Sequence, residues 1–225
     1  DGAINASYAD GSYAIFAGTG GEVTVDNSDG AVTASGMQFA SDGYVITGDA
    51  LTLVDPQSTI RVGDGSADGA SYTTTIASQL AGAGVQLVKT DLGTLVLSGD
   101  NSYTDGTRIS AGTLQVGDGG TTGSILGNVV NDGTLAFNRS DDVLFNGTVS
   151  GGGGLVKEGG GALTLTAANG YLGGTTIMDG TLRIASDANL GAASGGLRFD
   201  GGTLQTTADI GSGRDVALVG TGTFL

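Results

Sequence analysis

The feature that most constrains the fold is an internal repeat in the second half of the chain. Residues 87–116, LVKTDLGTLVLSGDNSYTDGTRISAGTLQV, align without a gap to residues 155–184, LVKEGGGALTLTAANGYLGGTTIMDGTLRI, with 14 of the 30 positions identical. Self-similarity of this kind is typical of solenoids, in which each repeat stacks on its neighbours. Within it lies a shorter unit, Gly-(Thr/Ala)-Leu-x-apolar, which begins at Gly93, Gly112, Gly133, Gly161, Gly180 and Gly202.

The spacing of the short units predicts how the long repeat is built. Successive units are 19, 21, 28, 19 and 22 residues apart, and the first three steps add up to the 68-residue offset of the long repeat. The long repeat is therefore expected to hold three short units. The 28-residue unit is expected to carry an insertion, and insertions often carry function.

Each short unit has the pattern of a strand. In TLQV at 113–116 and TLRI at 181–184, apolar and polar residues alternate, which puts the apolar side chains on one face. One such unit every 20 residues or so leaves room for two further short strands. The sequence therefore predicts an all-β, right-handed parallel β-helix of about eleven coils of roughly 20 residues. A β-sandwich is the alternative, but its hairpins place a strand roughly every 8–12 residues.

Composition narrows the function. The formal net charge is −15, and only eight residues are Lys or Arg, so the chain lacks the basic surface that nucleic acids or anionic membranes require. No apolar run is long enough to span a membrane, no direct membrane insertion is expected, and the chain does not open with a signal peptide. Residues 1–225 are interpreted as a single β-helix segment, a fragment of a longer protein.

The best repeats, residues 84–116 and 152–184, resemble the autotransporter-associated β-strand repeat. The residues that carry the resemblance in the first copy are Gly84, Leu87, Lys89, Gly93, Leu95, Leu97, Gly99, Asn101, Tyr103, Thr107, Gly112 and Leu114. Those in the second copy are Gly152, Leu155, Lys157, Gly161, Leu163, Leu165, Asn169, Tyr171, Gly174, Thr175, Gly180 and Leu182.

The resemblance implies a passenger of type V secretion, exported through a C-terminal β-barrel translocator and displayed on, or shed from, the surface of a Gram-negative bacterium. We expect such a segment to act in adhesion. Its partners would be the host cell surface, extracellular matrix, glycans or identical passengers on neighbouring bacteria. The alternative is a purely structural stalk that presents a separate N-terminal effector or protease domain.

Catalysis finds little support in the sequence. The chain has no His and no Cys, so it can form neither a Ser-His-Asp triad nor an ordinary zinc site, and no cofactor is expected. Asp141 and Asp142 form the only adjacent pair of carboxylates. With Asn138 and Arg139 they define a segment that is either a solvated turn or a binding loop in the longest unit.

A calcium contact is a further candidate. Asp64, Ser66 and Asp68 match the first half of a calcium-binding loop, but Thr75 stands where such a loop would place its bidentate Glu. A plain Gly/Asp turn is the competing interpretation.

The repeated polar residues are assigned mainly to architecture. Asn101 and Asn169 are expected to hydrogen-bond neighbouring backbone, and Tyr103 and Tyr171 to pack their rings while keeping their hydroxyls wet. The lysines of the repeat are expected at coil corners, solvated or paired with an Asp. Uncharged residues that suit binding are expected to point outward from the strands: Thr52, Gln115, Thr164 and Gln205.

Overall fold

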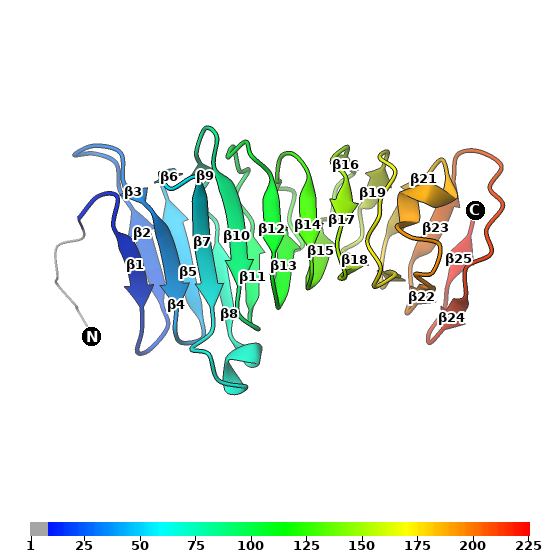
Figure 1. The fold of residues 1–225 in the computed structure, drawn as a ribbon, viewed down its shortest axis with the longest axis horizontal. Coiled ribbons are helices and arrows are strands. Elements are labelled where there is room, and N and C mark those ends of the chain that lie inside the picture. The colour runs from blue at the N-terminus through cyan, green and yellow to red at the C-terminus, as the bar shows by residue number, and fades with distance from the viewer. Residues whose placement is uncertain (1–8) are drawn as a thin grey trace.

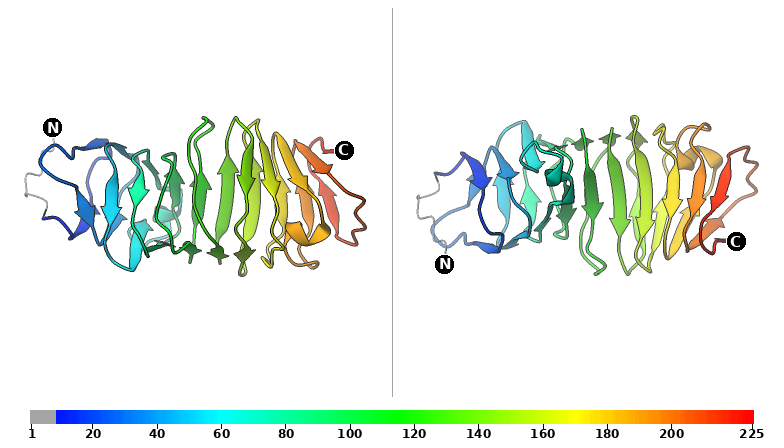
Figure 2. Two further views of the ribbon diagram at one scale, coloured as in Figure 1. Left: turned by 90° about the horizontal axis from the view of Figure 1, so that it is seen from above. Right: turned by 90° about the horizontal axis from the view of Figure 1, so that it is seen from below.

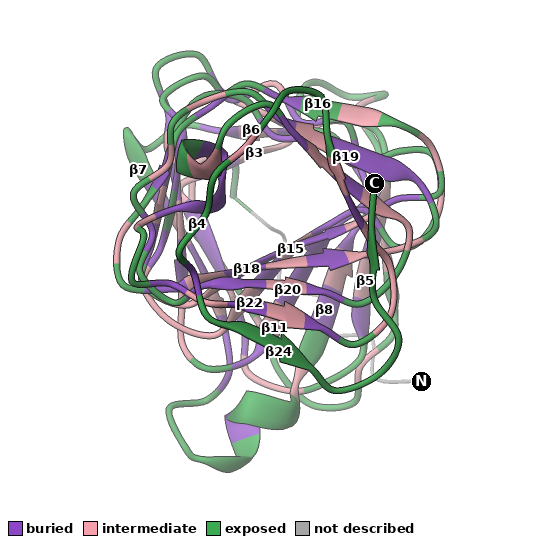
Figure 3. Ribbon diagram, turned by 90° about the vertical axis from the view of Figure 1, so that its right-hand side faces the viewer, coloured by how far each residue is buried: buried purple, intermediate pink, exposed green. Residues whose placement is uncertain are grey.

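The protein is an elongated solenoid of short parallel strands, with the first and last strands at opposite ends of the rod (Figure 1). This computed structural model describes residues 9–225. Every strand pair in that part is parallel, and the chain winds through three faces in each coil, as the view down the rod shows (Figure 3). None of the described residues forms a helix that is long and apolar enough to cross a membrane.

One face is a ten-stranded sheet that runs along the rod. Its strands are β2 (Glu22–Val25), β5 (Tyr44–Gly48), β8 (Thr73–Ile76), β11 (Thr94–Leu97), β13 (Thr113–Val116), β15 (Thr134–Asn138), β18 (Gly154–Glu158), β20 (Thr175–Ile177), β22 (Leu197–Phe199) and β24 (Val216–Leu218). Figure 2 shows how neighbouring strands lie side by side across the rod axis.

A seven-stranded sheet forms the second face. Its strands are β1 (Tyr13–Phe16), β4 (Gly36–Phe39), β7 (Gln57–Val62), β10 (Gln86–Thr90), β12 (Thr107–Ile109), β14 (Val129–Asn131) and β17 (Val149–Ser150).

The third face holds two shorter sheets. Two 3-10 helices lie in the connections between strands. The three-stranded sheet is β3 (Thr33–Ala34), β6 (Leu51–Leu53) and β9 (Leu80–Ala81). The five-stranded sheet is β16 (Val143–Phe145), β19 (Ala162–Leu165), β21 (Thr181–Ile184), β23 (Thr203–Thr206) and β25 (Thr223–Phe224). The helices are η1 (Asp68–Ser71), between β7 and β8, and η2 (Asp187–Leu190), between β21 and β22.

The core consists of inward columns of side chains, one from each coil. On the ten-stranded sheet, Leu95, Leu114, Leu135 and Leu155 are partners in successive strands, and all four are buried. Alternation along each strand puts every second residue into this column, so stacking coils builds one continuous apolar core. The parallel β-helix expected from the sequence is confirmed.

The coil count and the phase of the repeat differ from expectation. The ten-stranded sheet gives ten coils in residues 9–225, rather than about eleven, because some coils are longer than 20 residues. Gln57 and Gln86, partners in adjacent coils, are 29 residues apart. The segment between β7 and β8, which includes η1, projects from the rod in this coil (Figure 1).

The 28-residue unit is not an insertion. The first three short units lead into β11, β13 and β15 of the ten-stranded sheet, whereas the last three lead into β19, β21 and β23 of the third face. The long unit therefore spans one coil plus one further side, and it moves the motif from one face to the next. The two copies of the long repeat start on different faces, β10 and β18, so the long repeat is more than three coils long.

Candidate binding surface

The two repeat lysines are buried, which corrects the expectation of solvated or ion-paired side chains. Lys89 is 0% exposed and Lys157 is 2% exposed. Lys89 takes an inward position between Ile60 and Ile109 in the seven-stranded sheet. Lys89 lies one residue before the end of β10, close to the expected coil corner, but sequence periodicity alone does not show that its aliphatic stem continues the core column.

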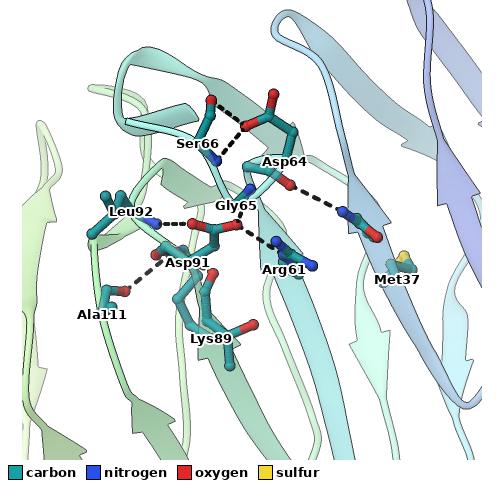
Figure 4. A network of polar contacts seen from close by, with 12 residues as sticks. Met37, Arg61, Asp64, Gly65, Ser66, Lys89, Asp91, Leu92 and Ala111 are labelled. Atoms are coloured by element: carbon teal, nitrogen blue, oxygen red, sulfur yellow. Dashed lines mark hydrogen bonds and ion pairs between the residues drawn. The ribbon is translucent and has the colours of Figure 1, made fainter. Parts of the chain in front are cut away.

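Each buried ammonium group is held by backbone carbonyls at the turn. Lys89 Nζ donates to the carbonyls of Thr90, Asp91 and Ala111 at 3.0, 2.8 and 3.2 Å, and the last of these lies in the next coil (Figure 4). Lys157 makes the equivalent three bonds in the second copy. Burial lowers the pKa of Lys89 to about 8, and it also lowers the pKa of Lys157.

The tyrosine hydroxyls are also buried, contrary to the expectation that they stay wet. Tyr103 and Tyr171 are both 0% exposed. The Tyr103 hydroxyl shares a hydrogen bond of 2.8 Å with Thr107 Oγ1, and Tyr171 pairs with Thr175 Oγ1 at 2.6 Å. Each threonine follows its tyrosine by four residues, so each hydrogen bond forms within a single coil of the solenoid. Burial raises the pKa of both phenols, that of Tyr171 to about 12.

The repeat asparagines join neighbouring coils through backbone hydrogen bonds. Asn101 accepts from the amide of Leu80 at 2.9 Å and donates to the carbonyl of Ser124 at 2.8 Å, so its one amide group bridges three coils. Asn169 accepts from Val149 and donates to the carbonyl of Asn189, each at 2.7 Å. These contacts are architectural, since the amides face protein backbone on both sides.

The calcium candidates do not converge. Asp64 Oδ1 accepts from both the amide and the hydroxyl of Ser66, at 2.9 and 2.6 Å, while Asp68 lies in η1. Within residues 9–225, no group of three or more acidic side chains is arranged to hold a metal ion. The hydrogen bonds from Ser66 lower the pKa of Asp64, as expected of an Asx turn.

A network that the sequence did not reveal fixes this projecting segment to the rod. Arg61 Nε donates to Asp91 Oδ2 at 2.8 Å, and the same oxygen accepts from the amide of Gly65 at 3.0 Å (Figure 4). Asp91 adopts a left-handed backbone conformation, with φ of 65°. Arg61 and Asp91 are 30 residues apart, and no local pattern links them.

The candidate binding loop, residues 138–142, is held against the solenoid by side-chain hydrogen bonds. Arg139 is 9% exposed, and its guanidinium donates to both carboxylate oxygens of Asp141 at 2.9 Å and to the carbonyls of Thr121 and Gly123. Asp142 accepts from Arg183 at 2.7 Å. These hydrogen bonds lower the pKa values of both carboxyl groups. Asn138 ends β15.

Acidic residues lie mainly in the turns of the solenoid. Among the acidic residues that the structure describes, only Glu22 and Glu158 lie in strands. Most of the ten-stranded sheet is consequently uncharged on its outer side. On β8, β11, β13 and β15 the outward residues are Thr73, Thr75, Thr94, Val96, Thr113, Gln115, Thr134, Ala136 and Asn138.

Four threonines form a ladder on this surface. Thr73, Thr94, Thr113 and Thr134 are direct partners in four successive coils, and all four are at least partly exposed. Successive strands are about 4.8 Å apart, so the side chains form a regular row. Val96 and Ala136 in the next column are buried, although they lie outside the main hydrophobic cluster.

The other outward residues named from sequence lie on the third face or beside it. Thr52 is in β6, Thr164 in β19 and Gln205 in β23, and each is partly exposed. Gln205 accepts from Arg183 Nε at 2.7 Å, which brings a charge onto that face. The seven-stranded sheet also carries outward charge, at Arg61 and Arg108. The ten-stranded sheet is therefore the face that best suits a neutral contact.

Comparison with known families agrees with the resemblance drawn from the sequence. The profile of the passenger-associated-transport-repeat matches residues 87–116 and 155–184. The fold and these repeats define the class: the chain is a repeat-bearing segment of the autotransporter passenger type, and this class implies export to the bacterial cell surface.

Among curated proteins, the chain is similar to a protein of Brucella suis biovar 1 (strain 1330) named Adhesin BmaC autotransporter. The two are 45% identical over 235 residues, which cover 92% of this chain and 7% of the relative. The chain thus spans a small part of that protein's length. No solved structure matches the chain.

Proposed function

We propose that this segment contributes an adhesive surface to an exported passenger, and that the uncharged outer side of the ten-stranded sheet is that surface. The observation that carries the proposal is that four successive strands of this sheet, β8, β11, β13 and β15, contain no charged residue. The name of the relative, an adhesin, supports the same role. The host cell surface, extracellular matrix, glycans and identical passengers are the candidate partners.

A surface of this kind would bind through many weak contacts. Threonine and glutamine side chains offer hydroxyl and amide groups at a regular spacing, with methyl groups between them. No single contact has to be strong, because repetition along a rod and across many copies on one cell multiplies the effective affinity.

We further propose that the segment has no enzymatic role. Catalysis by paired carboxylates needs one carboxyl group to hold a proton near neutral pH. Arg139 and Arg183 instead hold the pKa values of Asp141 and Asp142 below their usual range. Both groups are thereby kept ionised as partners of arginines.

The proposal is tested with the full-length passenger on a non-adherent bacterium. Residues 1–225 are replaced with a length-matched β-helix segment from another passenger, and host-cell attachment and bacterial clumping are scored at equal surface level. Loss of attachment or clumping is expected if the segment is adhesive. Survival of both would make the segment a stalk and place the adhesive site elsewhere.

A sharper test changes single faces. Thr94→Glu with Thr134→Glu charges the ten-stranded sheet, while Thr59→Glu with Val130→Glu charges the seven-stranded sheet as the matched control. Only the first pair is expected to reduce binding. Equal loss from both pairs would show that added charge acts without regard to face.

A further inference from the structure

One outward column of the ten-stranded sheet carries charge only near its two ends. Strand pairing places ten residues in register along the rod, one from each coil. Its charged members are an acid in the first coil and a base in the ninth, and the seven between them are uncharged. The column reads Glu22, Val45, Thr75, Val96, Gln115, Ala136, Val156, Thr176, Arg198 and Ala217.

The charges of this column are complementary to those of a second copy that runs in the opposite direction. Gln115, in the fifth coil, lies midway between Glu22 and Arg198. A two-fold axis along the strand direction at β13 turns a second copy end for end and lays the same sheet over the first. Glu22 of one copy then faces Arg198 of the partner copy at both ends, and the two Gln115 amides meet at the axis. Isologous contacts of this kind close into dimers.

We propose that the ten-stranded sheet binds a second copy of this chain, face to face and antiparallel, in this register. The inference rests on the proposed function, since it names the partner of the same surface.

The threonine ladder fits the same arrangement. With the axis at β13, Thr113 faces Thr113 of the partner copy, and Thr94 faces Thr134 of the partner copy. Thr73 faces Gly154 of the partner copy, which has no side chain to obstruct the approach. Small side chains of even height allow two sheets to approach closely, and their hydroxyl groups act as donor or acceptor as needed.

Charge explains why the partner meets this face in particular. Two copies with a formal net charge of −15 repel each other wherever their turns approach. The ten-stranded sheet carries few charged residues on its outer side, so it is where the acidic turns of both copies stay apart. Nine coils of strands four residues long give roughly 1,100 Å² of total contact, near the lower size limit for a specific interface. Such a dimer is weak by itself and gains strength between cells through many copies.

Charge reversal tests the register. Glu22 is exposed, and the Arg198 side chain is 42% exposed and pairs with Asp200 of its own chain at 2.9 Å. Both side chains lie at the surface, so Glu22→Arg and Arg198→Glu should leave the fold intact, which circular dichroism checks. Each single variant places like charges opposite each other, and sedimentation equilibrium is expected to show self-association roughly tenfold weaker or more. A mixture of the two variants restores both contacts and should associate like the original chain, as should the double variant.

Crosslinking provides an independent readout, because the chain has no cysteine. Gln115→Cys places a thiol on the axis, and a bismaleimide with a spacer of about 10 Å should join two copies across packed sheets. Val130→Cys, outward on the seven-stranded sheet, is the matched control and should react slowly. Single variants that associate like the original chain, a mixture that fails to recover, or equal crosslinking at both positions would overturn the proposal. Host attachment is scored separately, so a failed dimer leaves the adhesive function standing.

Discussion

The Nζ atom of Lys89 lies 3.2 Å from the backbone carbonyl oxygen of Ala111, which belongs to the next coil of the solenoid. The same ammonium group donates to two carbonyls of its own turn. One buried lysine therefore provides a hydrogen-bond donor for backbone carbonyls in its own turn and connects that turn to the turn of the next coil.

Replacing Lys89 with Met is expected to lower the free energy of unfolding by about 1–3 kcal/mol, because the side chain still fills the column but leaves three carbonyls without this donor. Urea unfolding followed by circular dichroism measures the change. Arg108→Gln removes an exposed ion pair and serves as control, with an expected effect below about 1 kcal/mol. A Lys89→Met variant as stable as the original would show that the ammonium bonds only offset its burial.

The lysine also predicts a pH dependence. Its pKa is about 8 in the fold and near 10.5 in the unfolded chain. The unfolded chain therefore binds more protons between these values, and stability rises with pH across that window. Relative to Lys89→Met, the original chain is expected to gain stability between pH 7.5 and 10. Urea titrations of both chains at several pH values check this, and parallel curves would contradict it.

The pair of Tyr103 and Thr107 predicts a non-additive double-mutant cycle. Tyr103→Phe leaves a buried threonine hydroxyl without its partner, at a cost of about 1–3 kcal/mol. Thr107→Val leaves the phenol unpaired in the same way. The double variant removes both polar groups and should be less destabilised than the sum of the single changes. Additive losses, measured by urea unfolding, would show that the two hydroxyls do not depend on each other.

Two adjacent glycines predict opposite responses to alanine. A Cβ atom at Gly161 would lie 2.0 Å from the carbonyl oxygen of Asp141 in the neighbouring coil, whereas a Cβ at Gly160 would have no atom within 4 Å. Gly161→Ala is expected to cost about 2 kcal/mol or more, because the backbone of two coils must separate. Gly160→Ala should change stability by less than about 0.5 kcal/mol. Thermal unfolding compares them, and equal losses would contradict close stacking at Gly161.

The regular parts of this structure could be predicted from local patterns. The alternation in residues 113–116 and 181–184 identified strands that the structure contains, and the spacing of Gly112 and Gly180 located their starts. The motif also singled out Lys89 and Tyr103 as recurrent. It could not show that they are buried, because a lysine and a tyrosine at a turn are usually at least partly exposed.

The long-range contacts had no signal in the sequence. Arg214 is 8% exposed and donates to Asp187 at 2.9 Å and to the carbonyls of Gly191 and Gly195 at 2.7 and 2.9 Å. Its place in the chain carries no motif that predicts this. The shift of the repeat between faces was hidden for the same reason, since the spacing of Gly133 and Gly161 gives a distance along the chain but not the side on which each strand lies.

The sequence by itself determined that this chain forms short strands and that they stack as a solenoid. These properties follow from alternation, glycine placement and a long repeat, all of which are local or periodic, whereas the class of exported passengers was implied by the resemblance of that repeat to a known family. The tertiary structure decided which face each strand occupies, which lysines and phenols are buried, and which residues align across coils from Glu22 to Arg198. Register and burial depend on the number of residues in the turns between the strands of each coil, and these numbers differ from coil to coil.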